Sequence, residues 1–308
     1  MFDTQSTSAT QNAHAAVVDP TVLPAQEVEY SAGRRVRRWV AELVRQPGLV
    51  LSLLWVLLVI AWAAAPTVFT SYDPIAANAA HSLRGPSGTY WFGTDNLGRD
   101  LYSRVVFGTR QSMQASVVAV GLSLALGAIL GMAAGYLGRW VDDLAMRVVD
   151  VLIAIPGLLL SMAVVSILGF GVTNVALAVG VAGIPGFARI IRAEVLRIKS
   201  STYFDAAQAS GTRTLAILVR HVVPNATGPV LVLAALELGG AVLSVSALSF
   251  LGYGSTPPAP EWGSLVSQGR DYMGTAWWLT TFPGLVVALT VLAANRIGRA
   301  LERTGVEA

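Results

Sequence analysis

The feature that most constrains this sequence is a long stretch without charge, because residues 151–188 contain no Asp, Glu, Lys or Arg. An α-helix rises about 1.5 Å per residue, so the stretch is too long for one crossing of a bilayer core about 30 Å thick. The turn signal Gly169-Phe170-Gly171 divides it. We therefore predict two membrane-spanning helices here, at residues 144–168 and 173–191.

Four other apolar stretches are long enough for a helix to cross the bilayer core, at residues 48–65, 111–136, 226–251 and 276–295. Only 13% of the chain is charged, against roughly 25% in soluble domains. In lipid every backbone polar group must be bonded within its own segment, and a helix achieves this. The sequence therefore predicts an all-α polytopic membrane protein with about six transmembrane helices. Its small residues between 115 and 135 are expected to let neighbouring helices approach closely.

Basic residues near the span ends predict the orientation. With the amino terminus inside, most of them fall on inner segments, which favours a multi-pass protein of the cell (inner) membrane with both termini in the cytoplasm. The first outer loop holds four arginines, more than this rule favours, and Asp95 and Asp100 are expected to offset them. A cluster of arginines before the first span is interpreted as a topology signal and not as a nucleic-acid site (Arg34, Arg35, Arg37, Arg38 and Arg45).

The composition excludes several kinds of site. The chain has no cysteine and three scattered histidines, so neither a disulfide nor a metal centre is expected. No G-x-x-x-x-G-K-[ST] pattern is present, so ATP would have to bind to another protein. An intramembrane enzyme is disfavoured, because the only serine flanked like a nucleophile, Ser87, lies in an outer loop. An ion-coupled secondary transporter would have only Glu237 and Asp150 for its ion path.

The polar segment between the fourth and fifth spans is long for a simple connection. Its Ala-rich start favours a short helix that ends at Gly211. Ala206 and Ala207 give this helix a flat face. A second helical stretch follows, and Pro224 ends it. This pattern predicts a helix–turn–helix exposed to water, onto which another surface could close.

Asp205-Ala206-Ala207, followed by Gly211 and a later proline, resembles the EAA loop of ABC importer permeases, with Asp in place of Glu. Residues 92–104 resemble the signature that precedes the second span of dipeptide and oligopeptide permeases, and residues 150–156 resemble their third span. Residues 248–263 and 277–284 resemble their fifth span, outer loop and sixth span. The resemblance covers about residues 34–303 and points to the C-type subunit of the paired permeases.

The resemblance implies a type I permease core with a cytoplasmic coupling helix, in an ATP-driven importer of dipeptides or oligopeptides. Implied partners are a homologous B-type permease, one or two cytoplasmic ABC ATPases or a fused pair, and an extracytoplasmic peptide-binding protein. ATP and Mg would bind to the ATPases, and this chain would hold no cofactor. Alternatives within the family are nickel or another small solute as the substrate.

The same resemblance divides the chain into segments. Residues 1–47 would be a cytoplasmic tail, 48–66 the first transmembrane helix and 67–110 an extracytoplasmic loop. Residues 111–303 would form the core of five helices, with the coupling loop at 197–225 and an outer loop at 252–275, and 304–308 would be a tail. By resemblance, the contact with the ATPase falls on Asp205, Ala206, Ala207, Gly211 and Pro224.

Two further groups of residues are candidates for binding. The outer loops either form a rigid cap or contact the incoming binding protein, through Asp95, Arg99, Asp100, Pro257, Pro258 and Trp262. Glu237 lies in the middle of the fifth span, where a carboxylate facing lipid costs several kcal/mol. It is expected either to hydrogen-bond to a neighbouring helix or to line a cavity near the amino end of a substrate. Pro156, Pro185 and Pro283 are expected to kink their helices.

Overall fold

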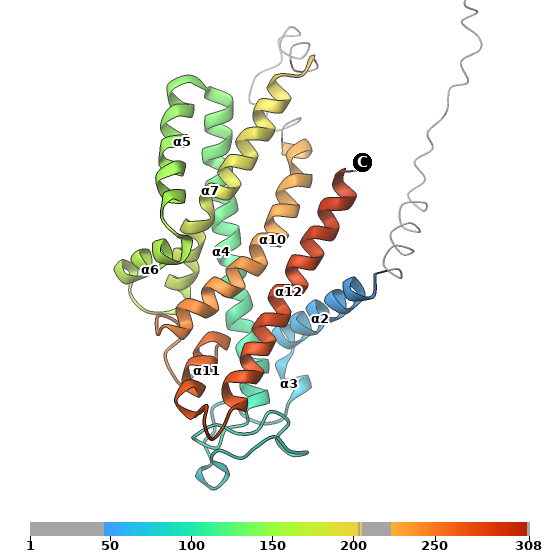
Figure 1. Cartoon of the computed structure of the whole chain (residues 1–308), viewed down its shortest axis with the longest axis vertical. Coiled ribbons are helices and arrows are strands. Elements are labelled where there is room, and N and C mark those ends of the chain that lie inside the picture. Colours follow the sequence, from blue (N-terminus) through green and yellow to red (C-terminus); the bar gives the residue numbers. More distant parts are fainter. Residues whose placement is uncertain (1–45, 203, 205–222, 307–308) are drawn as a thin grey trace, which may run out of the picture. The chain divides into compact units, whose positions relative to one another are not determined.

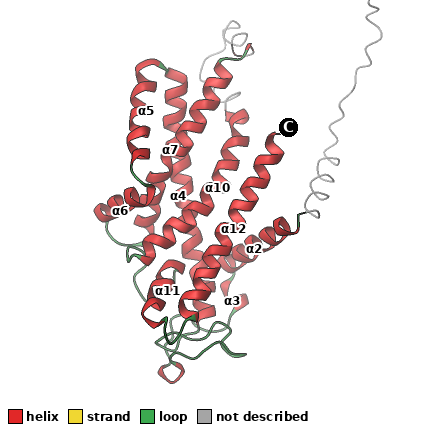
Figure 2. Ribbon diagram, in the orientation of Figure 1, coloured by secondary structure: helices red, strands yellow, loops and turns green. Residues whose placement is uncertain are grey.

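The computed structural model describes residues 46–202, 204 and 223–306. These residues are helical apart from their connecting loops, and no β-strand occurs in this part of the chain (Figure 2). Five helices are long and apolar enough to cross a membrane: α2 (Pro47–Ala64), α4 (Leu101–Leu137), α7 (Val172–Lys199), α10 (Val223–Phe250) and α12 (Trp278–Val306). A bent pair, α5 (Arg139–Ala154) and α6 (Gly157–Leu168), would make a sixth crossing. The all-α polytopic prediction is confirmed.

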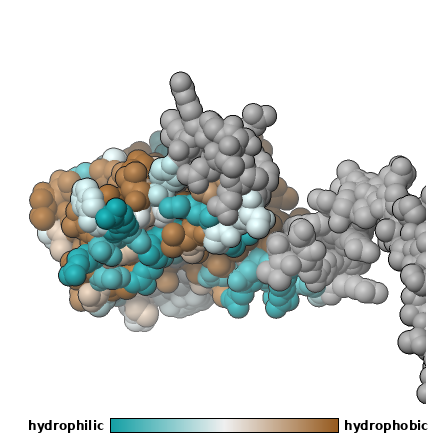
Figure 3. Space-filling model, turned by 90° about the horizontal axis from the view of Figure 1, so that it is seen from above, coloured by the Kyte–Doolittle hydropathy of each residue, from teal (hydrophilic) through white to brown (hydrophobic). Residues whose placement is uncertain are grey.

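Helices α4, α7, α10 and α12 lie side by side, with most loops at two ends and α6 at mid-height (Figure 1). At the cap end gather the loop before α4, the short helices α3 (Pro66–Phe69) and η1 (Ala79–His81), and then α11 (Trp262–Gly269) and η3 (Arg270–Tyr272). At the opposite end, here called the far end, lie the turn from α4 to α5, the end of α7, the start of α10 and the end of α12. Hydrophilic side chains gather on the uncovered part of this face (Figure 3).

Helices α4 and α7 form the most extensive helix pair, and three glycines explain how closely they approach. A Cβ atom added at Gly127 would lie 2.6 Å from the Cβ of Phe187. One added at Gly131 would lie 2.5 Å from the backbone oxygen of Ala188, and one at Gly135 would lie 2.8 Å from the Cβ of Val195. The expectation that small residues in this span allow close helix packing is confirmed.

Several helices extend beyond the predicted spans. α4 begins at Leu101 and not at residue 111, because the Asp100 carboxylate caps it by accepting the backbone N–H of Ser103 at 2.7 Å. α7 continues to Lys199 and α12 to Val306. Hydropathy marks the part of a helix that lipid can surround, and it does not mark where a helix with polar turns begins or ends.

Two predicted elements are different in the structure. The single helix expected over residues 144–168 is wrong, since α5 and α6 meet at 97°. Pro156 lacks an N–H group and holds Ile155 in an extended conformation (φ −93°, ψ 127°), which a helix cannot continue. The outer loop at 252–275 contains α11, which begins where the Glu261 carboxylate accepts the backbone N–H groups of Gly263 and Ser264 at 3.0 and 2.9 Å.

Candidate functional site

A cavity of about 190 Å³ lies between α4, α6, α7 and α10. Small residues form most of its wall, and its only charged group is Glu237 of α10. The wall residues with small side chains are Ala119, Ser123, Gly157, Ser161, Ala182, Gly183, Gly240, Ala241 and Ser244. The volume holds several water molecules, so the site is suited to a hydrated or polar group.

The Glu237 side chain lies near two glycines, one on α7 and one on α10. A Cβ atom at Gly186 of α7 would lie 3.7 Å from its Oε1, and one at Gly240 would lie 4.0 Å from its Oε2. Within the described ranges no hydrogen bond or ion pair to Glu237 is formed, so the structural hydrogen bond considered for this residue has no partner there. The carboxylate is half-buried and lines the cavity.

The serines of the cavity differ in their hydrogen bonds. Ser123 Oγ lies 2.7 Å from the backbone oxygen of Gly180 and 2.9 Å from that of Ala119. Ser161 Oγ donates to the backbone oxygen of Gly157 at 2.9 Å. Ser244 has no hydrogen bond to the part of the chain that the structure covers. It lies seven residues after Glu237, on the same face of α10, so one helix presents both a carboxylate and a hydroxyl to the cavity.

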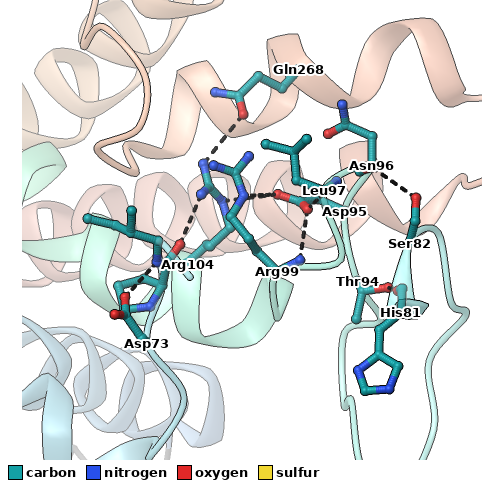
Figure 4. A network of polar contacts seen from close by, with 12 residues as sticks. Asp73, His81, Ser82, Thr94, Asp95, Asn96, Leu97, Arg99, Arg104 and Gln268 are labelled. Carbon is teal, nitrogen blue, oxygen red and sulfur yellow. Dashed lines mark hydrogen bonds and ion pairs between the residues drawn. The ribbon is translucent and has the colours of Figure 1, made fainter. Parts of the chain in front are cut away.

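A second polar site lies at the cap end and is buried (Figure 4). Asp95 Oδ2 lies 2.6 Å from Arg99 Nε and 3.6 Å from Arg104 Nε. Arg104 is fully buried and donates to the backbone oxygen of Pro74 at 3.0 Å and to Gln268 Oε1 of α11 at 3.4 Å. The network therefore fastens the loop before α4 and the helix α11 to the start of α4.

Four of the six outer residues predicted as candidate contacts are buried. Asp95, Arg99 and Asp100 are 5–6% exposed, and Trp262 is fully buried with its Nε1 donating to the backbone oxygen of Val105 at 3.1 Å. Burial raises the pKa of Asp100 above its ordinary value. These four residues build the cap. Pro257 and Pro258 are exposed, and their contact with a binding protein stays a prediction.

Sequence reasoning gave no role to Glu261, Arg104 or Gln268. Glu261 is fully buried and accepts hydrogen bonds from the two N–H groups that begin α11 and from Ser112 Oγ of α4 at 3.1 Å. Burial raises the pKa of its carboxyl group. The signal available in the sequence was an acidic residue directly after a proline and before an amphipathic stretch, which is typical of a helix start.

The predicted coupling residues fall largely outside the described ranges. This applies to Asp205, Ala206, Ala207 and Gly211, while Pro224 lies in the first turn of α10. The helix that leads to this segment is well fastened, since Lys199 Nζ donates to the backbone oxygens of Gly135 and Tyr136 at 3.2 and 2.9 Å. These oxygens belong to the last turn of α4, where a cation is favoured.

Two ion pairs also join α5 to α7 at the far end. Arg192 binds Asp142 through two hydrogen bonds of 2.5 and 2.6 Å. Arg189 Nη2 lies 2.7 Å from Asp150 Oδ1. The ends of α4 and α7 and the start of α5 are thus held together.

The membrane-spanning helices and the cavity between them define an integral membrane protein of the transport class. Among residues 46–202, 204 and 223–306, no group of three or more His, Cys, Asp or Glu residues could hold a metal. The inward-facing MetNI methionine ABC transporter has the same fold, with a TM-score of 0.53 and 19% identity over 65% of this chain and 97% of that chain. An amino acid ABC transporter chain gives a TM-score of 0.51 at 14% identity, over 66% of this chain and 94% of its own.

Residues 127–304 match the family described as binding-protein-dependent transport system inner membrane component, and the chain belongs to this family. A dipeptide transport system permease protein, DppC, of Alkalihalophilus pseudofirmus is 37% identical over 90% of this chain and 91% of its own. A glutathione transport system permease protein, GsiD, of Pectobacterium atrosepticum is 42% identical over 70% of this chain and 72% of its own. The chain is therefore a membrane permease component of an ABC importer.

Proposed function

We propose that this chain forms one half of the translocation pathway of an importer of dipeptides or oligopeptides. The observation that carries the proposal is the cavity, which four helices of one chain line with small residues and a single carboxylate. Such a wall leaves space for a flexible polar ligand. The similarity to permeases named for dipeptide and glutathione transport supports peptides over nickel or another small solute.

The remaining parts of the importer would be other proteins. A homologous B-type permease would line the other half of the pathway, and an extracytoplasmic protein would deliver the peptide, as the family description implies. One or two cytoplasmic ABC ATPases, or a fused pair, would bind ATP and Mg, because this sequence has no phosphate-binding G-x-x-x-x-G-K-[ST] pattern.

The far end would face the cytoplasm, with both termini there. Exposed arginines are frequent at this end, and they include Arg139, Arg147, Arg197, Arg299 and Arg303. At the cap end, in contrast, Asp95 lies beside Arg99 and Arg104 and offsets their charge. This distribution agrees with the preference for positive charge on the cytoplasmic side.

The segment from Asp205 to Pro224 would then couple ATP hydrolysis to transport. Its resemblance to the EAA loop supports this role, and so does its place between α7 and α10, both of which line the cavity. A partner that binds the segment differently with and without ATP would bias the two helices between two arrangements.

A bulky substitution in this segment tests the function. In the importer reconstituted with its ATPases, permease partner and binding protein, the wild-type chain should import peptide when ATP is supplied. Ala207→Trp should keep the ATPase bound and reduce import at least about tenfold, which corresponds to about 1.4 kcal/mol of lost coupling. Ala76→Trp, the same change at an exposed cap-end position, is the matched control.

Full import by Ala207→Trp with the ATPase still bound would contradict the coupling role. Peptide import by the wild-type chain in vesicles that contain no ATPase would instead support a secondary transporter. Import of nickel but of no peptide would show that the substrate is nickel and not a peptide.

A further inference from the structure

The carboxylate of Glu237 is the only charge in the wall of the cavity, and no cation of the described residues neutralises it. A negative charge at this depth in a membrane is unfavourable unless it faces water or meets a cation. Gly186 and Gly240, which have no side chain, lie beside its two oxygens. The site is therefore open to a positively charged group that arrives from outside the chain.

The wall chemistry narrows the kind of cation. A divalent metal prefers several carboxylate, carbonyl or imidazole ligands, and this wall supplies one carboxylate. A guanidinium is bound best by two parallel hydrogen bonds from a carboxylate and by stacking on aromatic rings, and the wall has no aromatic residue. A primary ammonium needs only one close carboxylate and hydroxyl or water oxygens for its other N–H groups.

The size of the cavity decides how much of a ligand it holds. At about 190 Å³ it is smaller than the roughly 300–1,000 Å³ of pockets that enclose a whole small molecule. It therefore receives one end of a longer ligand. Ser244 lies about 10 Å farther along α10 than Glu237, the distance that about three residues of an extended peptide span. Its hydroxyl, which has no hydrogen bond to the described residues, lines the cavity where a later group of the peptide would lie.

We propose that Glu237 binds the α-ammonium group of a peptide while it passes through the cavity, with Ser244 contacting the peptide backbone farther along. The proposal rests on the peptide transport inferred above, and it assigns the recognised end of the substrate. A Cβ atom alone at Gly186 or Gly240 would make ordinary contact with the carboxylate, at 3.7 and 4.0 Å, whereas a longer side chain at either position would extend toward it.

The test compares two probes in the complete importer reconstituted in vesicles: labelled trialanine and N-acetylated trialanine, which lacks the ammonium. The binding protein is the same in every sample, so its own selectivity cancels when variants are compared. Glu237→Gln should lower the import rate of trialanine about tenfold and leave that of the acetylated peptide unchanged. Glu237→Asp keeps the charge and should retain at least half of the trialanine rate.

Glu302→Gln makes the same chemical change at an exposed position of α12 and should leave both rates unchanged. If the wild-type importer does not import the acetylated peptide, the test depends on trialanine alone. Its import rate should then fall for Glu237→Gln and be largely retained for Glu237→Asp. Unchanged trialanine import by Glu237→Gln overturns the proposal, and so does an equal decrease for both peptides, which would indicate a structural role.

A second substitution covers the case in which Glu237→Gln does not assemble. Gly240→Val adds a side chain beside Oε2 and should lower trialanine import several-fold. Gly121→Val is its control, because a Cβ atom at Gly121 meets no neighbouring atom. Full import by Gly240→Val would overturn the proposal. Absence of ATP-dependent import of any peptide by the wild-type importer would instead contradict the proposed function.

Discussion

The polar network around Asp95 at the cap end and the pair Arg189–Asp150 at the far end use charged side chains in opposite ways. At the cap end the side chains of Arg99, Arg104 and Asp95 are between 0 and 9% exposed, and at the far end those of Arg189 and Asp150 are 51 and 64% exposed. The ion-pair distances are nearly equal, 2.6 Å for Arg99–Asp95 and 2.7 Å for Arg189–Asp150. Exposure distinguishes these two sets of charges, and distance does not.

This difference has consequences for rigidity. Removing one partner of a buried pair leaves an unpaired charge in a low-dielectric region, at a cost of about 3–5 kcal/mol. An exposed pair contributes about 0–1 kcal/mol and can be replaced by contacts with water. The network at the cap end therefore has one stable arrangement, whereas the exposed pair Arg189–Asp150 between α5 and α7 can be exchanged for contacts with water at little cost.

The largest effect is expected from Arg104→Met. The substitution keeps an unbranched apolar stem but removes the guanidinium and its hydrogen bonds to Pro74 and Gln268, leaving polar groups without partners. The free energy of unfolding should fall by about 3 kcal/mol, measured as thermal or denaturant unfolding of the solubilised complex. Arg270→Met, at a side chain that is 63% exposed, should change it by less than about 0.5 kcal/mol. Equal losses would contradict the contrast between the two environments.

Glu261→Ala should have an intermediate effect. It removes the acceptor for the backbone N–H groups of Gly263 and Ser264, and loss of such a cap costs about 1–2 kcal/mol. Asp271→Ala, at a carboxylate that is 76% exposed and next to the same helix, is the matched control. Unchanged stability of Glu261→Ala would show that this carboxylate does not hold α11.

The pH dependence of Glu261 gives a separate measurement. Burial raises its pKa in the folded state above the ordinary 4.5, so the folded state retains a proton that the unfolded state loses. This contribution to stability is complete below pH 4.5 and is lost as the pH rises through the raised pKa. Glu261→Gln should therefore show a smaller loss of stability than wild type as the pH increases from 4.5. An identical pH profile would contradict the raised pKa.

The smallest effect is expected at the far end. Asp142→Asn weakens the two hydrogen bonds to Arg192, a pair whose side chains are 19 and 32% exposed, and should cost less than about 1 kcal/mol. Asp150→Asn, at a more exposed pair, should cost less than about 0.5 kcal/mol. The same unfolding measurement checks both. A loss of 3 kcal/mol at Asp142 would show that the far end is as fixed as the cap end.

The sequence was sufficient to predict features that depend on residues close to one another along the chain. Apolar length predicted the spans, and Pro156 was correctly expected to disturb its helix, although only the structure shows that it divides the span. Asp143 and Arg147 have the spacing of a helical ion pair, yet the described residues form no such pair. Asp142 instead binds Arg192, fifty positions away, and no local pattern reports a partner at that distance.

The candidate site shows the same limit. Glu237, Gly240, Ala241 and Ser244 follow one face of a helix, so the polar face of α10 could be found from spacing alone. The structure is needed to show that Ser123 of α4 and Ser161 of α6 line the cavity with this face, because their positions depend on how the helices pack. The burial of Trp262 likewise depends on tertiary contacts, and for this reason the sequence placed it among the candidate surface contacts.

The glycines between α4 and α7 restrict which parts of the molecule can move. Gly127, Gly131 and Gly135 each hold α4 against the backbone or a Cβ atom of α7, and such contacts have no alternative rotamers to adopt. Sliding of one helix along the other would have to break all three contacts together. The two helices therefore form an invariant frame, and any alternation in the width of the cavity must come from displacement of α6 and α10 relative to it.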